Sequence, residues 1–290
     1  MTGPETTANG GPAPTRYIPF DYSNRCKRDV AEGYSFLRGN LTEDFPIILI
    51  AFAPLAPQPL LTALALLSFH LSLWVIYEAG YVDNDRMARQ FELEPKLPNA
   101  FERFDAVYDE RLAWIWAMAL AVPGTLLTVH IGVPYLAALG WFAVVPILVI
   151  WATVLGALRG VYYMYNRIDK MSRVYLYLPL QLFKYGFAAV FFAPSATAVA
   201  MITAQLIRQW VPYIVYRTGN RLRKNNPARV WRLLTYIMVW LLLLPGAASW
   251  GFVFHGLLGL GWYLLRSAGQ LRQELGKLRR VRDDTWTSTS

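Results

Sequence analysis

Long uncharged stretches constrain this chain more than any other feature of its sequence. There are four, covering residues 45–77, 112–158, 174–207 and 233–265, and Lys184 is the one formally charged residue inside them. A helix that crosses a bilayer needs about 20 predominantly apolar residues. Each stretch therefore predicts a hairpin of two membrane-spanning helices, which gives about eight spans.

Proline, glycine and other turn residues interrupt each predicted hairpin. The interruptions are Pro54, Pro57 and Pro59 in the first stretch, Gly132 and Pro134 in the second, Ala193–Pro194–Ser195 in the third and Pro245–Gly246 in the fourth. Such residues favour turns. Three stretches are short for two full spans at about 1.5 Å per residue, so some helices extend into polar flanks or one is re-entrant. The predicted fold class is all-α, a polytopic membrane helix bundle.

The composition supports a membrane location. Hydrophobic residues make up 55% of the 290 residues and charged residues 16%, whereas soluble domains contain about 25% charged residues. A net charge of +9 suggests nucleic-acid binding, but the basic residues lie between the apolar stretches, where membrane proteins keep their cytoplasmic loops. We therefore expect the lipid bilayer as a partner and no nucleic acid.

Charged segments alternate with the apolar hairpins. They cover residues 1–44, 83–111, 159–173, 208–232 and 266–290, and hold every Lys and Arg except Lys184 and every Asp and Glu except Glu78. An even number of spans puts both termini on the basic side, which is expected to be cytoplasmic. The predicted parts are a polar, partly disordered N-terminal segment (1–35), a transmembrane domain (36–267) and a basic tail (268–290).

An acidic segment follows the first predicted hairpin. Glu78, Asp85 and Glu92 are seven residues apart, so they share one face if the helix continues past Tyr77. Carboxylates at a membrane surface suit Mg²⁺, which binds one or two carboxylates together with substrate phosphates. The alternative is a solvated charged helix with internal ion pairs, such as Asp85 with Arg89.

The same segment carries a resemblance to a known family. Leu37–Arg38–Gly39–Asn40, the proline-broken first hairpin and Asn84–Asp85 resemble the UbiA superfamily of intramembrane prenyltransferases. That family has an N-D-x-x-D-x-x-x-D motif, and the corresponding positions here hold Asn84, Asp85, Ala88 and Glu92. Ala88 is a departure. The resemblance covers the layout of residues 36–265, including the basic residues after Tyr165.

The resemblance implies a set of functional residues. It implies Mg²⁺ bound by Asn84, Asp85, Glu92 and Glu78, and catalytic roles for Asp85, Glu92 and Lys170. The second aspartate-rich motif of the family is absent, since residues 216–224 contain no acid. Arginine forks and lysines bind phosphate well, so a substrate diphosphate is expected to bind instead to Arg38, Arg173, Arg217, Arg221, Arg223 and Lys224. Alternatively, these basic residues fix the orientation of the helices in the membrane and attract anionic lipid.

Three functional hypotheses follow. The first is a UbiA-like prenyltransferase that acts on a prenyl diphosphate at the cytoplasmic face with Mg²⁺, or a terpene cyclase of the same type. The second is a non-catalytic membrane protein that binds a lipid or pigment or scaffolds a complex. The third is a transporter, for which Glu78 and Lys184 are the only candidate charges within the predicted spans.

Overall fold

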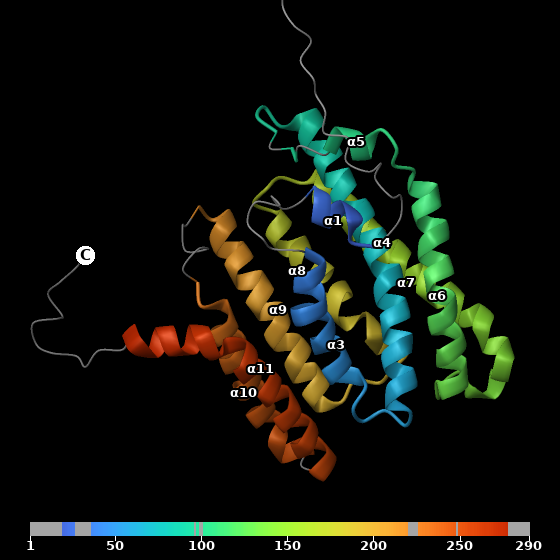
Figure 1. The fold of residues 1–290 in the computed structure, drawn as a ribbon, viewed down its shortest axis with the longest axis vertical. Helices are drawn as coiled ribbons and strands as arrows, with labels where there is room; N and C mark the ends of the chain where they lie inside the picture. Colours follow the sequence, from blue (N-terminus) through green and yellow to red (C-terminus); the bar gives the residue numbers. More distant parts are fainter. Residues whose placement is uncertain are drawn as a thin grey trace, which may run out of the picture. The chain divides into compact units, whose positions relative to one another are not determined.

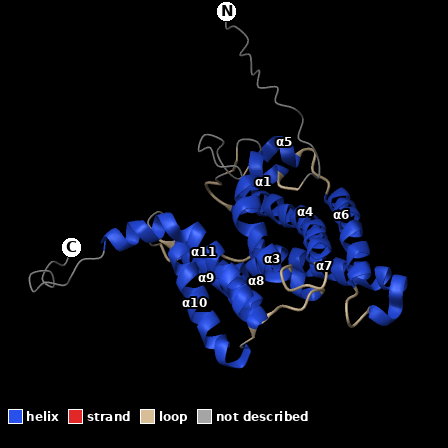
Figure 2. Ribbon diagram, turned by 60° about the horizontal axis from the view of Figure 1, so that its bottom comes forward, coloured by secondary structure: helices blue, strands red, loops and turns tan. Residues whose placement is uncertain are grey.

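The chain is described here from a computed structural model, which covers residues 19–26, 36–95, 97–98, 101–219, 226–247 and 249–277. Every regular element in these ranges is a helix, and none of them is a strand (Figure 2). The prediction of an all-α fold is therefore confirmed for the described residues.

Eleven α-helices form the described part of the chain (Figure 1). They are α1 (Asp21–Arg25), α2 (Phe36–Gly39), α3 (Phe45–Phe52), α4 (Pro59–Phe91), α5 (Phe101–Asp105), α6 (Glu110–Ile131), α7 (Val144–Arg167), α8 (Arg173–Gly186), α9 (Ala196–Arg217), α10 (Ala228–Ala247) and α11 (Trp250–Lys277). Short π- and 3₁₀-helical segments, η2 (Asn40–Asp44), η3 (Ala137–Ala143) and η4 (Phe187–Val190), join some of them.

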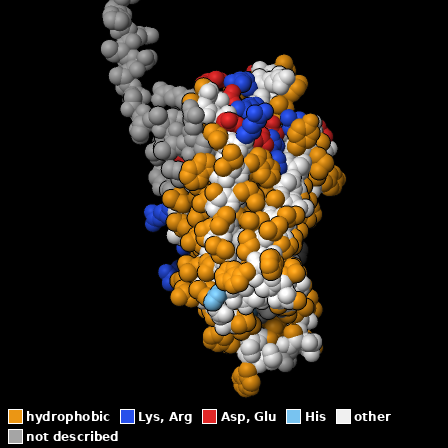
Figure 3. Space-filling view, turned by 90° about the vertical axis from the view of Figure 1, so that its right-hand side faces the viewer, with side chains coloured by type: hydrophobic (Ala, Val, Ile, Leu, Met, Phe, Trp, Pro, Cys, Tyr) orange, Lys and Arg blue, Asp and Glu red, His pale blue; other side chains and the backbone are white. Residues whose placement is uncertain are grey.

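Four helical segments in the described ranges are long and apolar enough to cross a membrane. They are Pro59–Phe91, Glu110–Ile131, Ala137–Arg167 and Ala228–Ala247. Large apolar side chains such as Phe142 and Leu242 lie on the outside. Hydrophobic side chains cover much of the face drawn in Figure 3, while many charged ones crowd together at one end of it. These features support the prediction of an integral membrane protein.

The helices break close to the predicted turns. The chain turns between α3 and α4, after α6 and before α9. Gly132 follows α6 with a φ of 83°, a conformation that favours glycine because it has no Cβ. The last break differs, because α10 continues through Pro245 to Ala247. Proline is tolerated inside a membrane helix when neighbouring groups satisfy the freed backbone carbonyl.

The chain divides into two compact units, which we describe separately. The first unit contains residues 1–45 and 60–168, and the second contains 46–59 and 169–290. The predicted boundaries also differ from helix ends: α11 extends to Lys277, inside the predicted tail. Residues 21–25 of the predicted disordered segment form α1.

Buried polar side chains join α4, α6 and α7 in the first unit. Ser72 Oγ donates to the carbonyl of Ala117 at 2.6 Å, and Trp151 Nε1 donates to Ser72 Oγ at 2.8 Å. Ser68 Oγ donates in the same way to the carbonyl of Leu120. These bonds satisfy polar groups that would otherwise be costly to bury, and they fix the three helices beside one another.

In the second unit, α9 packs against α8, α10 and α11 (Figure 1). The Tyr263 hydroxyl donates to the carbonyl of Met201 at 2.8 Å, which joins α11 to α9. His255 on α11 contacts both the Ile50 carbonyl at 2.5 Å and Ser195 Oγ at 3.1 Å. Since a carbonyl only accepts, His255 donates from Nε2 and accepts the Ser195 hydroxyl at Nδ1.

Candidate functional site

The C-terminal half of α4 carries three of the predicted metal ligands, Glu78, Asn84 and Asp85. The helix is unbroken to Phe91, so Glu78 and Asp85 do lie on one helix at the expected spacing. Both are buried, with exposed fractions of 7% and 3%. Glu92 follows the last helical residue and is partly exposed, and Asn84 is partly buried.

Glu78 is held by the backbone of α1. The Phe20 amide donates to Oε2 at 2.8 Å and the Ser23 amide donates to Oε1 at 2.7 Å. The first amides of a helix have no acceptor within the helix. The carboxylate therefore satisfies donors at the start of α1, and both of its oxygens are engaged by the protein.

Asp85 is held by side chains. The Tyr22 hydroxyl donates to its Oδ2, and Asn84 Nδ2 donates to Oδ1 at 3.2 Å. Burial, followed by the nearby charge of Asp85, raises the pKa of Tyr22 well above its usual value. Tyr22 therefore stays protonated and remains a hydrogen-bond donor to Asp85.

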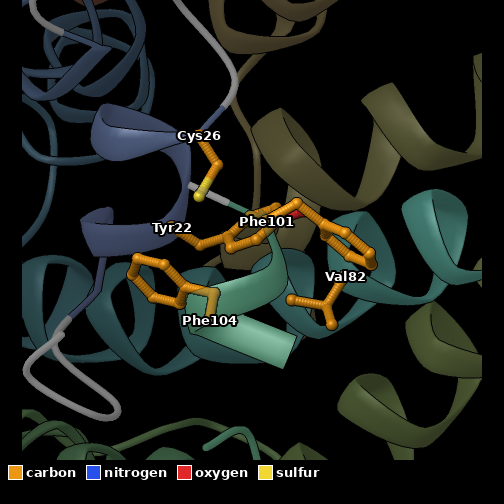
Figure 4. Packing of buried hydrophobic residues seen from close by; sticks show 5 residues of the cluster. All are labelled: Tyr22, Cys26, Val82, Phe101 and Phe104. Atoms are coloured by element: carbon orange, nitrogen blue, oxygen red, sulfur yellow. The ribbon is translucent and has the colours of Figure 1, made fainter. Parts of the chain in front are cut away.

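Apolar packing holds α1 in this position. Tyr22 and Cys26 lie against Val82 of α4 and against Phe101 and Phe104 of α5 (Figure 4). The Tyr22 and Phe104 rings meet edge to face, with centroids 5.3 Å apart. The N-terminal segment is thus built into the acidic end of α4, a contact that the sequence alone did not predict.

Hydrogen bonds engage the two buried carboxylates that were predicted to bind Mg²⁺, and the metal site stays a prediction. The described ranges contain no group of three or more His, Cys, Asp or Glu side chains placed to hold a metal ion. Glu78 and Asp85 each accept hydrogen bonds from α1 or its side chains. The alternative pair of Asp85 with Arg89 does not form either, because Arg89 contacts Asp105 at 2.9 Å and Glu102 at 3.3 Å.

An ionic cluster surrounds Asp83, which sequence reasoning assigned to a cytoplasmic segment. Its carboxylate lies 3.3 Å from Arg159, 3.0 Å from Arg167 and 3.0 Å from the Asn166 amide. Arg159 also contacts Glu110 of α6 at 2.7 Å. The cluster was missed because Arg159 and Arg167 were counted as loop residues, whereas α7 extends to Arg167.

The predicted phosphate-binding residues are distributed over both units. Arg38 is exposed on α2 in the first unit, and Lys170 is exposed just before α8 in the second. Arg173 begins α8 and is partly buried. Arg217 ends α9, where its Nε donates to the Tyr213 hydroxyl at 2.9 Å. The other predicted residues, Arg221, Arg223 and Lys224, lie outside the described residues.

The predicted basic loop is shorter than expected. It was placed at residues 208–232, but α9 continues to Arg217 and α10 begins at Ala228. Arg208 and Arg232 therefore belong to helices. The Arg232 side chain is completely buried in the second unit, and it donates to the Gln205 side-chain oxygen at 3.1 Å. Sequence reasoning assigned Arg232 no role of its own, although its position beside an apolar stretch is a signal for burial.

Comparison with known proteins gives no match for this chain, whether among protein-family models, curated proteins or solved structures. The resemblance to the UbiA superfamily therefore remains a prediction that rests on Asn84, Asp85 and the layout of the apolar stretches. The function has to be argued from the residues themselves.

Proposed function

We propose that this chain is a multi-pass membrane prenyltransferase of UbiA-like architecture, with about eight spans and both termini in the cytoplasm. The observation that carries the proposal is the pair Asn84–Asp85 on α4, at the end of a helix long enough to span a membrane. The substrate is a prenyl diphosphate whose apolar chain lies among the helices.

Buried aromatic rings that lie about 12–16 Å before Asp85 along the axis of α4 support this chemistry, because they would face the prenyl chain. The Tyr77 ring has its centroid 4.8 Å from that of Trp74 and 5.0 Å from that of Tyr162. Aromatic faces attract cations, and prenyl transfer proceeds through an allylic cation. In the proposed reaction, the bond from the prenyl carbon to the diphosphate breaks and a bond to the acceptor forms. The acceptor's proton then passes to Asp85.

Basic residues neutralise the departing diphosphate in this proposal. Electrostatic stabilisation of developing charge usually contributes more than any other effect to such catalysis. The residues proposed for it are Lys170, Arg38, Arg173, Arg217, Arg221, Arg223 and Lys224. Glu92 is proposed to assist Asp85. If Mg²⁺ binds, Asn84, Asp85, Glu92 and Glu78 would hold it, and it would polarise the diphosphate.

Turnover of allylic diphosphates tests the proposal. Purified protein in lipid nanodiscs is incubated with geranyl, farnesyl and geranylgeranyl diphosphate and a panel of acceptors, with and without Mg²⁺. We expect diphosphate release and a prenylated product, both lost in Asp85→Asn and retained in the exposed control Glu102→Gln. Wild-type protein that is inert with every donor would refute the proposal. Product formed without an acceptor would identify a terpene cyclase.

A non-catalytic lipid-binding or scaffolding protein is the second candidate. It is favoured by the hydrogen bonds that occupy Glu78 and Asp85, because they give both carboxylates a role in holding α1. This candidate predicts that native lipid purifies with the protein and that Asp85→Asn leaves the bound amount unchanged. Mass spectrometry of lipids extracted from both variants distinguishes it from the enzyme.

A further inference from the structure

A serine and a histidine meet at the start of α9 in the second unit. Ser195 is the N-cap of α9, and its Oγ lies 3.1 Å from Nδ1 of His255 on α11. The Nε2 of the same ring donates to the carbonyl of Ile50 on α3 at 2.5 Å. His255 therefore carries its proton on Nε2, and its Nδ1 accepts a hydrogen bond from the Ser195 hydroxyl. A base that activates a serine needs this arrangement.

A proline explains why the Ile50 carbonyl is available to His255. In a continuing helix this carbonyl would accept from the amide four residues later, but that residue is Pro54, which has no N–H. The last helical bond here joins the Ala53 amide to the Leu49 carbonyl. The Ile50 carbonyl thus orients the imidazole of His255 from the side opposite Ser195, as the third group of a catalytic triad does.

The serine is accessible, whereas the histidine is shielded. Ala193 and Pro194 are exposed and Ser195 is partly exposed, but His255 has an exposed fraction of 1%. The Ala198 amide donates to Ser195 Oγ at 3.1 Å and holds the side chain in place. The N-terminus of a helix carries a partial positive charge, so an oxyanion formed on a carbonyl that Ser195 attacks is stabilised there.

The sequence around this pair indicates the class of substrate. Residues 45–77, 185–207 and 233–265, which contain Ile50, Ser195 and His255, hold no Lys, Arg, Asp or Glu. A charged substrate would find no partner in these stretches, and burying an unpaired charge is costly. Ser195 also lies at a predicted hairpin turn, so we expect it at the edge of the bilayer. A neutral ester with an apolar acyl chain suits such a position.

We propose that Ser195 and His255 form a catalytic pair that hydrolyses a carboxylic ester of an amphiphilic lipid. Ser195 Oγ attacks the carbonyl carbon while its proton passes to Nδ1 of His255. The bond to the alcohol breaks, and the alcohol takes that proton. Water then attacks the acyl-serine and gives a proton to Nδ1, which returns it to Ser195 as the carboxylic acid leaves. This activity does not depend on prenyl transfer, which is proposed to use other residues.

Covalent labelling of the wild type tests the nucleophile. The protein in nanodiscs is treated with an alkyl fluorophosphonate, which reacts with activated serines, and the modified residue is located by mass spectrometry. Ser249 is a matched internal control, because its Oγ accepts from the Phe252 amide at 3.1 Å at the start of α11, as that of Ser195 accepts from Ala198. We expect label on Ser195 and none on Ser249. No label on Ser195, or equal labelling of both, would overturn the proposal.

Hydrolysis of p-nitrophenyl octanoate and of dioleoylglycerol by matched variants tests the pair. Ser195→Asn keeps a side chain suited to an N-cap but no hydroxyl, so its rate should fall to background. His255→Gln keeps a donor for the Ile50 carbonyl and should be slower by roughly 100- to 10,000-fold, the usual contribution of a general base. Ser249→Asn should hydrolyse both esters as the wild type does.

Two results of this assay would overturn the proposal. One is a Ser195→Asn protein with the rate of the wild type, and the other is a wild type that hydrolyses neither ester. Circular dichroism checks that each variant is folded. If a variant does not fold, the labelling pattern of the wild type still decides the proposal, because it requires no substitution.

Discussion

The two units of this chain carry net charges of opposite sign. The first unit contains 12 Lys and Arg against 15 Asp and Glu, for a net charge of −3, and the second contains 16 against 4, for +12. Charged groups at the end of α4 pair with residues of α1, α5 and α7. In the second unit, Arg232 is buried against an amide oxygen and a ring. The first unit thus uses opposite charges to hold its helices together, whereas the second carries a large excess of positive charge.

The largest expected effect comes from breaking the ionic cluster around Asp83 in the first unit. Asp83→Ala leaves Arg159 and Arg167 without their shared carboxylate. Breaking a buried pair from one side costs several kcal/mol, so we expect a loss of about 3 kcal/mol in unfolding free energy, measured in mixed micelles. Glu102→Ala is the control, since the Glu102 side chain is 70% exposed. Its pair should contribute at most about 1 kcal/mol, and equal losses would show that Asp83 is no more than a surface partner.

The units differ in net charge, but we expect their helices to be packed equally tightly. A Cβ at Gly80 would lie 2.3 Å from the Tyr162 ring, and one at Gly256 would lie 2.2 Å from the Trp240 ring. Overpacking typically costs about 1–3 kcal/mol, so Gly80→Ala and Gly256→Ala should each lower the unfolding free energy by about 2 kcal/mol.

Gly160→Ala and Gly261→Ala are the matched controls, because a Cβ at either position meets nothing within 4 Å. Alanine favours a helix over glycine by about 1 kcal/mol, and these controls should be neutral or stabilising. Loss of stability at Gly80 but not at Gly256 would mean that the units differ in packing as well as in charge.

A smaller effect is expected from loosening α1. Tyr22→Phe removes the hydroxyl that donates to Asp85 and should lower the unfolding free energy by about 1–2 kcal/mol. Amide hydrogen exchange at residues 19–26 should become faster. Unchanged exchange in these residues would show that apolar packing alone holds the segment.

The pH dependence of Tyr22 provides an independent measurement. Burial raises its pKa above the usual value of 10.0, so ionisation favours the unfolded chain. The wild type should therefore keep this contribution below about pH 10 and lose stability as the pH rises further. Tyr22→Phe should lack that part of the alkaline loss, and parallel curves for the two proteins would contradict the raised pKa.

Turn residues made much of the helix layout predictable, but helix ends were harder to place. Proline and glycine located the breaks near Pro57, Gly132 and Pro194. Arg159 and Arg232 were counted as loop residues because they are charged. The end of α7 was therefore predicted too early and the start of α10 too late. Tertiary contacts explain both cases: Arg159 is paired with carboxylates, and Arg232 is buried between helices.

The candidate site was predictable only in part. The spacing of Glu78 and Asp85 correctly placed both on one face of a continuing helix. Their hydrogen-bond donors include residues more than 50 positions earlier, since Phe20 and Ser23 donate to Glu78 and Tyr22 donates to Asp85. Such a long-range contact leaves no local pattern in the sequence. Metal ligation and the holding of α1 require the same carboxylates, and sequence spacing does not distinguish them.

The most direct test of the contrast between the units is to remove one arginine from each. Unfolding free energies of Arg159→Met and Arg232→Met are measured in neutral lipid and phosphate-free buffer. Arg159→Met leaves Asp83 and Glu110 short of a partner and should cost about 2 kcal/mol. Arg232→Met removes a buried charge but leaves the buried Gln205 oxygen without this donor, so it should cost less, about 1 kcal/mol. Equal losses in the two variants would contradict the proposed contrast.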